Sequence, residues 1–131
     1  MISLVTGGCG FIGSHMVDRL LAEGHTVRVI DNWTTGRPEN LEHQKDNPNL
    51  TIYHMDIRNR EEIQPVFQGV DYIFHFAALA DIVPSIQKPW EYYSSNVIGT
   101  YNVVECAKDA GIKKLVYAAS SSCYGIPDEY P

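Results

Sequence analysis

The sequence predicts an α/β fold, a doubly wound parallel sheet with helices on both faces. Two observations support this prediction. Near the N-terminus an apolar strand segment leads through a glycine-rich turn into a helix, and from there strand-like and helix-like segments alternate along the chain. At 131 residues the chain has the length of one domain and is long enough to bury a core.

The glycine-rich turn follows the first predicted strand, Ile2 to Val5. Its glycines form both Gly-x-x-Gly-x-x-Gly and Gly-x-Gly-x-x-Gly, a pattern that holds a dinucleotide pyrophosphate at the start of a helix. We expect Gly7 and Gly8 to allow a tight turn with positive φ and Gly10 to let the backbone approach the phosphates. Gly13 should let the helix pack closely on the strand.

An acidic residue follows the second predicted strand, Thr26 to Ile30, which begins after the first helix stops at Gly24. This residue, Asp31, comes eighteen residues after Gly13, near the spacing of the acid that binds the adenosine ribose in dinucleotide sites. The alternative is that Asp31 and Asn32 only open a polar turn. Because strand, glycines, helix and acid occur together, we favour the dinucleotide site.

The third strand is predicted at Leu50 to Met55, and a short helix should follow it. Asn59 and Glu62 have the spacing of a capping box for this helix. The helix should end near Gly69, and Pro65 should kink or shorten it.

The fourth and fifth strands are predicted at Tyr72 to Phe76 and Leu115 to Ala119, with a long helix between them that ends at Gly111. The apolar positions of this helix recur near helical spacing at Tyr93, Val97, Tyr101, Val104, Cys106 and Ala107. With right-handed crossovers, the five strands form a Rossmann-type sheet of order 3-2-1-4-5.

The composition narrows the possible partners. A net charge of −6 and a pI near 5.2 argue against binding to nucleic acid or to an anionic membrane, since both require clustered Lys and Arg. Cys9, Cys106 and Cys123 are too scattered for a disulfide framework or a zinc site, so we expect no metal and a cytoplasmic location. Met1 leads directly into the first strand, and we therefore expect no secretory leader and no membrane span.

Six ordered motifs resemble those of the extended short-chain dehydrogenase/reductases, and among them most closely the NAD-dependent nucleotide-sugar epimerase/dehydratase group that includes the UDP-glucose and UDP-N-acetylglucosamine 4-epimerases. The motifs extend along the whole chain. They are Thr6 to Gly13 (TGGCGFIG), Asp31-Asn32, Asp56-Ile57, His75 to Ala78 (HFAA), Asn96 to Thr100 (NVIGT) and Ser120 to Gly125 (SSSCYG).

The resemblance implies NAD as the cofactor. The cofactor-binding residues that it assigns to the first motif are Gly7, Gly10, Phe11, Ile12 and Gly13. Phe11 and Ile12 are expected to contact the pyrophosphate through backbone N–H groups, while Asp31 and Asn32 are expected to bind the adenosine ribose.

Further cofactor contacts follow from the same resemblance. Asp56 should accept a hydrogen bond from the exocyclic amine of adenine, and the N–H of Ile57 should donate to the ring. Phe76, Ala77 and Ala78 match a loop that passes close to the cofactor phosphates and ribose. Asn96 matches an asparagine that holds active-site backbone and water. Without the motif order, Asp56 would be interpreted as a helix-capping acid and Asn96 as a solvent-facing helix residue.

The resemblance also implies substrate contacts. Ser120 matches the Ser or Thr that bonds the sugar 4-hydroxyl, and Ser121 and Ser122 should lie toward the substrate, although a run of three serines alone is most often a flexible turn. Dehydratases of the group have Asp and Glu at these two positions, so the serines argue against dehydratase chemistry. Ala80 stands where many epimerases of the group have a lysine beside the cofactor.

The catalytic Tyr-x-x-x-Lys of this superfamily does not occur in the sequence. In relatives it follows the serine motif, at a position that would lie beyond Pro131. We therefore expect residues 1–131 to be the N-terminal, NAD-binding portion of a homodimeric UDP-hexose 4-epimerase, without the later strands and the substrate domain. The alternatives are another nucleotide-sugar enzyme (decarboxylase, dehydratase or reductase) and a non-catalytic dinucleotide-binding module.

Overall fold

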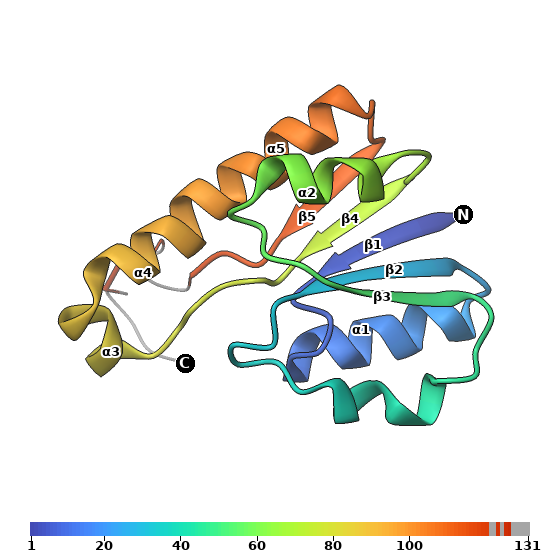
Figure 1. Cartoon of the computed structure of the whole chain (residues 1–131), viewed down its shortest axis with the longest axis horizontal. Coiled ribbons are helices and arrows are strands. Elements are labelled where there is room, and N and C mark those ends of the chain that lie inside the picture. The colour runs from blue at the N-terminus through green and yellow to red at the C-terminus, as the bar shows by residue number, and fades with distance from the viewer. Residues whose placement is uncertain (121–122, 124, 127–131) are drawn as a thin grey trace.

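The structure is a computed structural model that describes residues 1–120, 123 and 125–126. Its centre is a parallel sheet in the order β3-β2-β1-β4-β5 (Figure 1). The strands are β1 (Ile2–Thr6), β2 (Thr26–Asp31), β3 (Leu50–His54), β4 (Tyr72–His75) and β5 (Lys114–Tyr117). The predicted fold class and strand order are confirmed.

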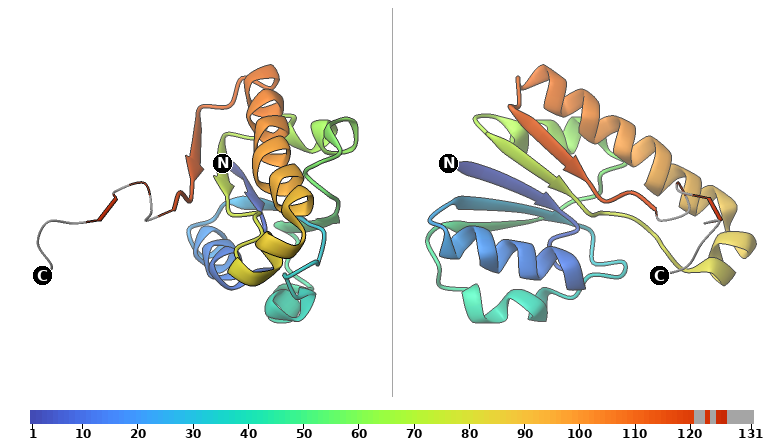
Figure 2. Two further views of the ribbon diagram at one scale, coloured as in Figure 1. Left: turned by 90° about the vertical axis from the view of Figure 1, so that its left-hand side faces the viewer. Right: turned by 180° about the vertical axis from the view of Figure 1, so that it is seen from behind.

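Helices cover both faces of this sheet (Figure 2). The α-helices are α1 (Phe11–Ala22), α2 (Arg60–Ile63), α3 (Ile82–Gln87), α4 (Pro89–Tyr93) and α5 (Thr100–Asp109). Three further helical segments are η1 (Pro38–Gln44) and η2 (Gln64–Phe67), both 3₁₀ helices, and η3 (Ser94–Gly99), a π-helix. None of the helices in the described part of the chain is long and apolar enough to cross a membrane.

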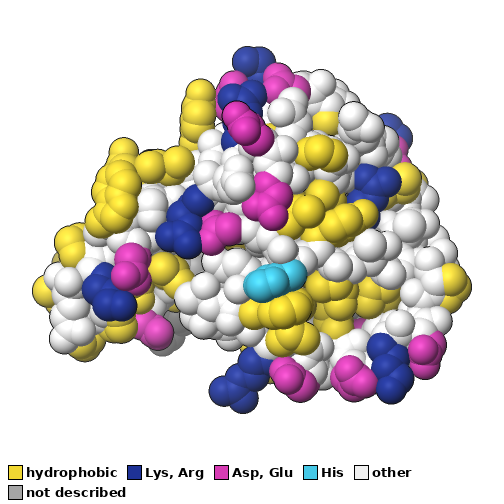
Figure 3. Space-filling view, in the orientation of Figure 1, with side chains coloured by type: hydrophobic (Ala, Val, Ile, Leu, Met, Phe, Trp, Pro, Cys, Tyr) yellow, Lys and Arg dark blue, Asp and Glu magenta, His cyan; other side chains and the backbone are white. Residues whose placement is uncertain are grey.

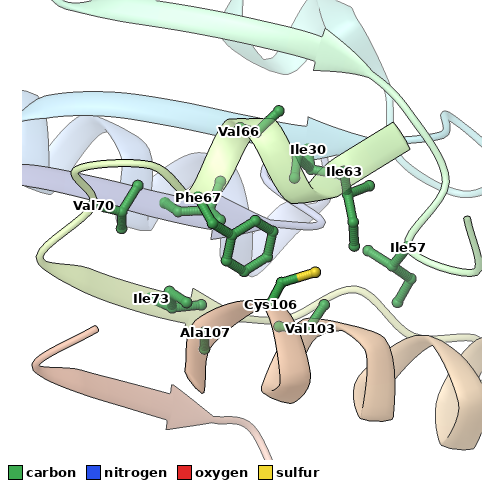
Figure 4. Packing of buried hydrophobic residues seen from close by; sticks show 11 residues of the cluster. Ile30, Ile57, Ile63, Val66, Phe67, Val70, Ile73, Val103, Cys106 and Ala107 are labelled. Atoms are coloured by element: carbon green, nitrogen blue, oxygen red, sulfur yellow. The ribbon is translucent and has the colours of Figure 1, made fainter. Parts of the chain in front are cut away.

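Alternate residues of the central strand, β1, pack into two separate hydrophobic cores. Leu4 packs with α2, η2 and α5, whereas the next residue, Val5, packs with α1 and η1. This period of two is what a strand covered on both faces requires. In the larger core Phe67 lies against the face of α5 that carries Cys106 and Ala107 (Figure 4).

The predicted long helix differs from the structure in two respects. It runs without a break through α4, η3 and α5, but its middle part is a π-helix, and most of its predicted apolar stripe is exposed: Tyr93 by 52%, Val97 by 51%, Tyr101 by 59% and Val104 by 44%. The buried face instead carries small and polar residues beside Val103. Hydrophobicity alone therefore selected the wrong face for the first part of this helix.

The second helix is short, as the proline suggested. α2 ends at Ile63, and the chain continues as the 3₁₀ helix that contains Pro65. The predicted capping box is wrong in its geometry, because Asn59 makes no side-chain cap to the backbone. Its amide donates instead to Glu62 Oε2 at 3.0 Å.

Candidate cofactor site

A cavity of about 350 Å³ lies at the carboxyl ends of the central strands, the edge where α/β sheets bind ligands. Residues from four of the six sequence motifs come together in its wall. Those among the predicted site residues are Gly7, Gly10, Asp31, Asn32, Ile57, Phe76, Ala77 and Ala78. The sequence prediction thus located this cavity, although the side chains of Phe11, Ile12, Asp56, Asn96 and Ser120 are not part of its lining.

The glycine-rich turn is held against the loop after β4. Gly7 has a φ of +69°, and a Cβ at this position would lie 2.7 Å from the backbone nitrogen of Ala77. A Cβ on Gly13 would overlap the carbonyl oxygen of Gly7, so helix α1 can approach the turn only with glycine there. Gly8 does not have the positive φ that we expected; its lack of a side chain leaves space for Val29.

Helix α1 begins directly after this turn. Its N-cap is Gly10, which provides no side-chain cap, and Ser14 is the first residue whose N–H returns to the Gly10 carbonyl, at 2.9 Å. The N–H groups of Phe11 and Ile12 belong to the first turn, where a helix lacks internal acceptors, while both side chains are exposed. This arrangement suits an anion bound by backbone N–H groups.

Asp31 connects the glycine-rich turn to the loop that follows β2. Asp31 is buried, and its carboxylate accepts N–H bonds from Cys9 at 3.0 Å and from Trp33 at 2.8 Å. Gly36 packs on the same carboxylate, where a Cβ would lie 2.7 Å from both oxygens. A carboxylate has about four acceptor directions, so two remain for a diol such as a ribose.

Asp56 lies in a denser network than the sequence suggested. One oxygen accepts the backbone N–H of Arg58 and its Nε, both at 2.9 Å; the other accepts Arg58 Nη2 at 2.6 Å and Asn32 Nδ2 at 2.9 Å. The hydrogen bond from Arg58 lowers the pKa of Asp56 to about 2. These bonds use the four acceptor directions of the carboxylate, so an adenine amine would have to share one with Arg58.

Sequence reasoning missed Arg58, which lines the cavity. The signal in the sequence was the position of Arg58, two residues after Asp56.

Asn96 fixes the loop after β4. Its side-chain amide donates to the carbonyl of Leu79 and accepts the N–H of the same residue, both at 2.8 Å. The π-helix η3 contains Asn96, and such bulges are frequent at functional sites. The alternative in which Asn96 faces solvent is therefore wrong, while its contact with active-site water stays a prediction.

Sequence reasoning also missed the buried His75, which links the ends of the two central strands, β1 and β4, next to this loop. His75 Nδ1 lies 2.5 Å from Thr6 Oγ1, and Nε2 lies 2.9 Å from Thr100 Oγ1. Thr6 Oγ1 also accepts the N–H of Ala77 at 3.4 Å. Burial lowers the pKa of His75 to about 4, so the ring is neutral at pH 7 and supports the loop as a hydrogen-bonding group.

Ser120 is described and exposed, three residues after the end of β5. Its carbonyl accepts the N–H of Cys123 at 3.1 Å. Ser121 and Ser122 lie outside the described residues. Within the described chain no three His, Cys, Asp or Glu side chains gather closely enough to hold a metal ion.

The sheet order, the glycine-rich turn before α1 and the acid at the end of β2 define a Rossmann-type dinucleotide-binding domain. Comparison with known proteins gives the family. The chain belongs to the NAD dependent epimerase/dehydratase family, whose profile matches residues 3–131.

Several relatives are similar over nearly the whole chain. UDP-glucuronic acid decarboxylase 2 of Arabidopsis thaliana is 41% identical over 98% of this chain, and UDP-glucose 4-epimerase of Bacillus subtilis is 36% identical over 100% of it. The chain spans only 27% and 40% of the lengths of these two relatives. A dTDP-glucose 4,6-dehydratase structure from Streptomyces venezuelae, with NAD and TYD bound, is 38% identical with a TM-score of 0.91, covering 99% of this chain and 42% of that one.

The family is NAD-dependent, and the residues in the cavity fit this cofactor. The backbone cradle at Gly7 and Gly13 would be filled by a Cβ at either position. The two remaining acceptor directions of Asp31 match a ribose diol. Within the described part of the chain no basic side chain bonds Asp31, which suits the uncharged 2′-hydroxyl of NAD better than a phosphate.

Proposed function

We propose that this chain forms the NAD-binding part of a nucleotide-sugar 4-epimerase that acts on a UDP-hexose. The sequence Ser120-Ser121-Ser122 supports an epimerase over a dehydratase, because it keeps the hydroxyl expected at the sugar 4-position and lacks the Asp-Glu pair of the dehydratases. UDP-glucose 4-epimerases also recur among the similar proteins and structures.

In this proposal each part of the site has its own task. Gly7 and the first N–H groups of α1 bind the pyrophosphate, and Asp31 and Asn32 bind the adenosine ribose. Asp56 and Ile57 bind adenine. When bound, NAD accepts and returns hydride, which allows a transient oxidation at sugar C4 and return of hydrogen to the opposite face.

Ser120 would hydrogen-bond the sugar 4-hydroxyl and hold it for removal of its proton. No tyrosine in this sequence precedes a lysine at the fourth position, so the general base must come from other residues of the protein. The 131 residues alone should therefore bind cofactor without catalysing epimerisation.

A decarboxylase is the alternative with specific support. UDP-glucuronic acid decarboxylases are 41% and 38% identical to this chain, which is no lower than the identity of the epimerases. The first oxidation at C4 would be common to both reactions, which would differ in the step that follows it: loss of CO₂ in one and return of hydride to the opposite face in the other. A module without catalysis is the remaining alternative.

The exposed helical stripe supports a homodimer. Hydrophobic side chains gather along α4, η3 and α5 (Figure 3), and the exposed ones are Trp90, Tyr93, Val97, Tyr101 and Val104. A stripe of this length along a helix is typical of helix packing between subunits. Sedimentation of the full gene product tests this proposal, and a monomer at micromolar concentration would contradict it.

The enzymatic proposal is tested with the full gene product that carries this sequence. We expect conversion of UDP-glucose to UDP-galactose with NAD retained on the protein. Release of CO₂ from UDP-glucuronic acid, without epimerisation, would replace the proposal with the decarboxylase. NAD binding without turnover of any UDP-sugar would support the non-catalytic module.

A further inference from the structure

Helix α5 holds the turn that follows β3 through side-chain hydrogen bonds. The side-chain amide of Asn102 donates to the carbonyl oxygens of Ile57 at 3.0 Å and Arg58 at 2.9 Å. Asn102 is only 7% exposed. An amide has two N–H donors, and here each one reaches a different carbonyl of the same turn.

These two carbonyls belong to peptide groups whose opposite ends bond to Asp56. The peptide that carries the Ile57 carbonyl also carries the N–H of Arg58, which donates to Asp56 Oδ1 at 2.9 Å. The next peptide carries the Arg58 carbonyl and the N–H of Asn59, which donates to the Asp56 carbonyl at 3.0 Å. Because a peptide group is planar, fixing its oxygen also fixes the direction of its N–H. Asn102 thereby orients Asp56 through two peptide planes.

Gly99, one turn earlier on the same helical face, lets the turn approach. A Cβ on Gly99 would lie 2.6 Å from Ile57 Cδ1 and 2.7 Å from Cγ1. Ile57 is buried in the larger core, so its side chain has little space to move away. Gly99 and Asn102 together form a seat for residues 56–58.

We propose that Asn102 is a positioning residue for adenine recognition, and that Gly99 and Asn102 hold Asp56 and the N–H of Ile57 where they can distinguish adenine from other bases. This inference rests on the adenine contacts of the proposed function. The other interpretation is that Asn102 only attaches α5 to the loop and contributes to stability.

The two roles are separated by a pair of cofactors that differ only in the base. Nicotinamide hypoxanthine dinucleotide has a carbonyl in place of the adenine amine and a proton on the adjacent ring nitrogen. It would therefore place an acceptor against Asp56 and a donor against the Ile57 N–H. The wild-type protein should bind NAD more tightly than this analogue by about tenfold or more.

The experiment measures dissociation constants of both dinucleotides for the full gene product and its variants by fluorescence titration. In Asn102→Ala we expect the preference for NAD to fall to about twofold or less, mainly through weaker NAD binding. Val103→Ala is the matched control, because Val103 is a buried neighbour on α5 that makes no bond to the turn. It should lower the thermal unfolding midpoint and leave the preference unchanged.

Gly99→Ala separates recognition from stability if Asn102→Ala does not fold. The added methyl overpacks Ile57, which should lower the unfolding midpoint as Val103→Ala does, but only Gly99→Ala should also lower the preference for NAD. A preference that survives in Asn102→Ala, or in Gly99→Ala where only that variant folds, would overturn the role of the seat. Equal binding of both dinucleotides by the wild-type protein would instead refute the adenine assignment, and the inference with it.

Discussion

Gly7 and Ala77 are in backbone contact across the carboxyl ends of β1 and β4, so close that a Cβ on Gly7 would lie 2.7 Å from the nitrogen of Ala77. Gly7 also has a φ of +69°, where L side chains are disfavoured. The contact joins the turn proposed for the pyrophosphate to the loop after β4, and both line the cavity.

Gly7→Ala should therefore destabilise the protein by more than the cost of placing alanine at a positive φ. A positive φ costs about 1 kcal/mol for alanine, and the backbone overlap adds to it. Gly24→Ala is the control, since Gly24 has a φ of +79° with nothing within 4 Å of a Cβ. The measurements are urea unfolding and NAD affinity. If both variants lose the same stability and both keep NAD binding, the close approach has no energetic role.

Asp56 should stabilise the protein in a pH-dependent manner. Its pKa of about 2 in the folded protein lies below the ordinary value of 3.8, so the stabilisation is present above pH 4 and is lost as the pH falls toward 2. Because the pair with Arg58 is partly exposed, we expect about 1 kcal/mol or less. Asp56→Asn should lose this amount at pH 7 and match the wild type near pH 2. Arg58→Ala should flatten the same pH dependence in unfolding experiments, and an unchanged slope would contradict the assignment.

His75 should also make the stability of the protein depend on pH, in a higher pH range than Asp56. The pKa of its buried ring is about 4, against 6.5 for an unperturbed histidine. Between these pH values the unfolded chain binds a proton at this ring and the folded chain does not. The contribution of the neutral ring to the free energy of unfolding is fully present above pH 6.5. It falls as the pH decreases toward 4, by about 3 kcal/mol at most. His75→Gln can keep hydrogen bonds without a titrating ring and should lack this slope. The free energy of unfolding between pH 7.5 and 4 provides the test, and an equal slope in both proteins would place the titrating group elsewhere.

The sheet could be predicted because its signals are local. Each strand is a short apolar run followed by turn residues, and the connections leave one order of parallel strands. The glycine-rich turn was equally visible, since its conformation depends on residues next to each other in sequence.

The interactions that support the site were not visible, because they join distant residues. Asn102 and Ile57 are 45 positions apart, and His75 and Thr6 are 69 apart. Asn102 lies on the buried face of α5, whereas Tyr101 beside it is exposed. A periodicity based on hydrophobicity favours the tyrosine, so a buried amide that bonds to a turn could be found only once the tertiary structure was known.

Asp31 should give the protein a preference for NAD over NADP. Its carboxylate would face the 2′-phosphate of NADP at close range, and Arg28, the nearest arginine in sequence, donates instead to the carbonyls of Val66 and Gln68. We expect NAD to bind more tightly by about tenfold or more, and Asp31→Asn to narrow this difference by removing the charge. Titration of the full gene product with both cofactors measures it. Equal affinity in the wild type would contradict the prediction.

Ser120→Ala should reduce turnover far more than cofactor binding. The hydroxyl is proposed to contact the reacting sugar oxygen, and Ser120 is not part of the lining of the proposed cofactor cavity. Loss of one such hydrogen bond in the transition state reduces kcat by about 100-fold, while the Kd for NAD should change by about twofold or less. Ser120→Thr keeps a hydroxyl and should retain most of the activity. The comparison uses steady-state epimerase assays and NAD titration of the full gene product. Normal turnover in Ser120→Ala would exclude the role, and a larger loss in Ser121→Ala would show that the motif is shifted by one residue.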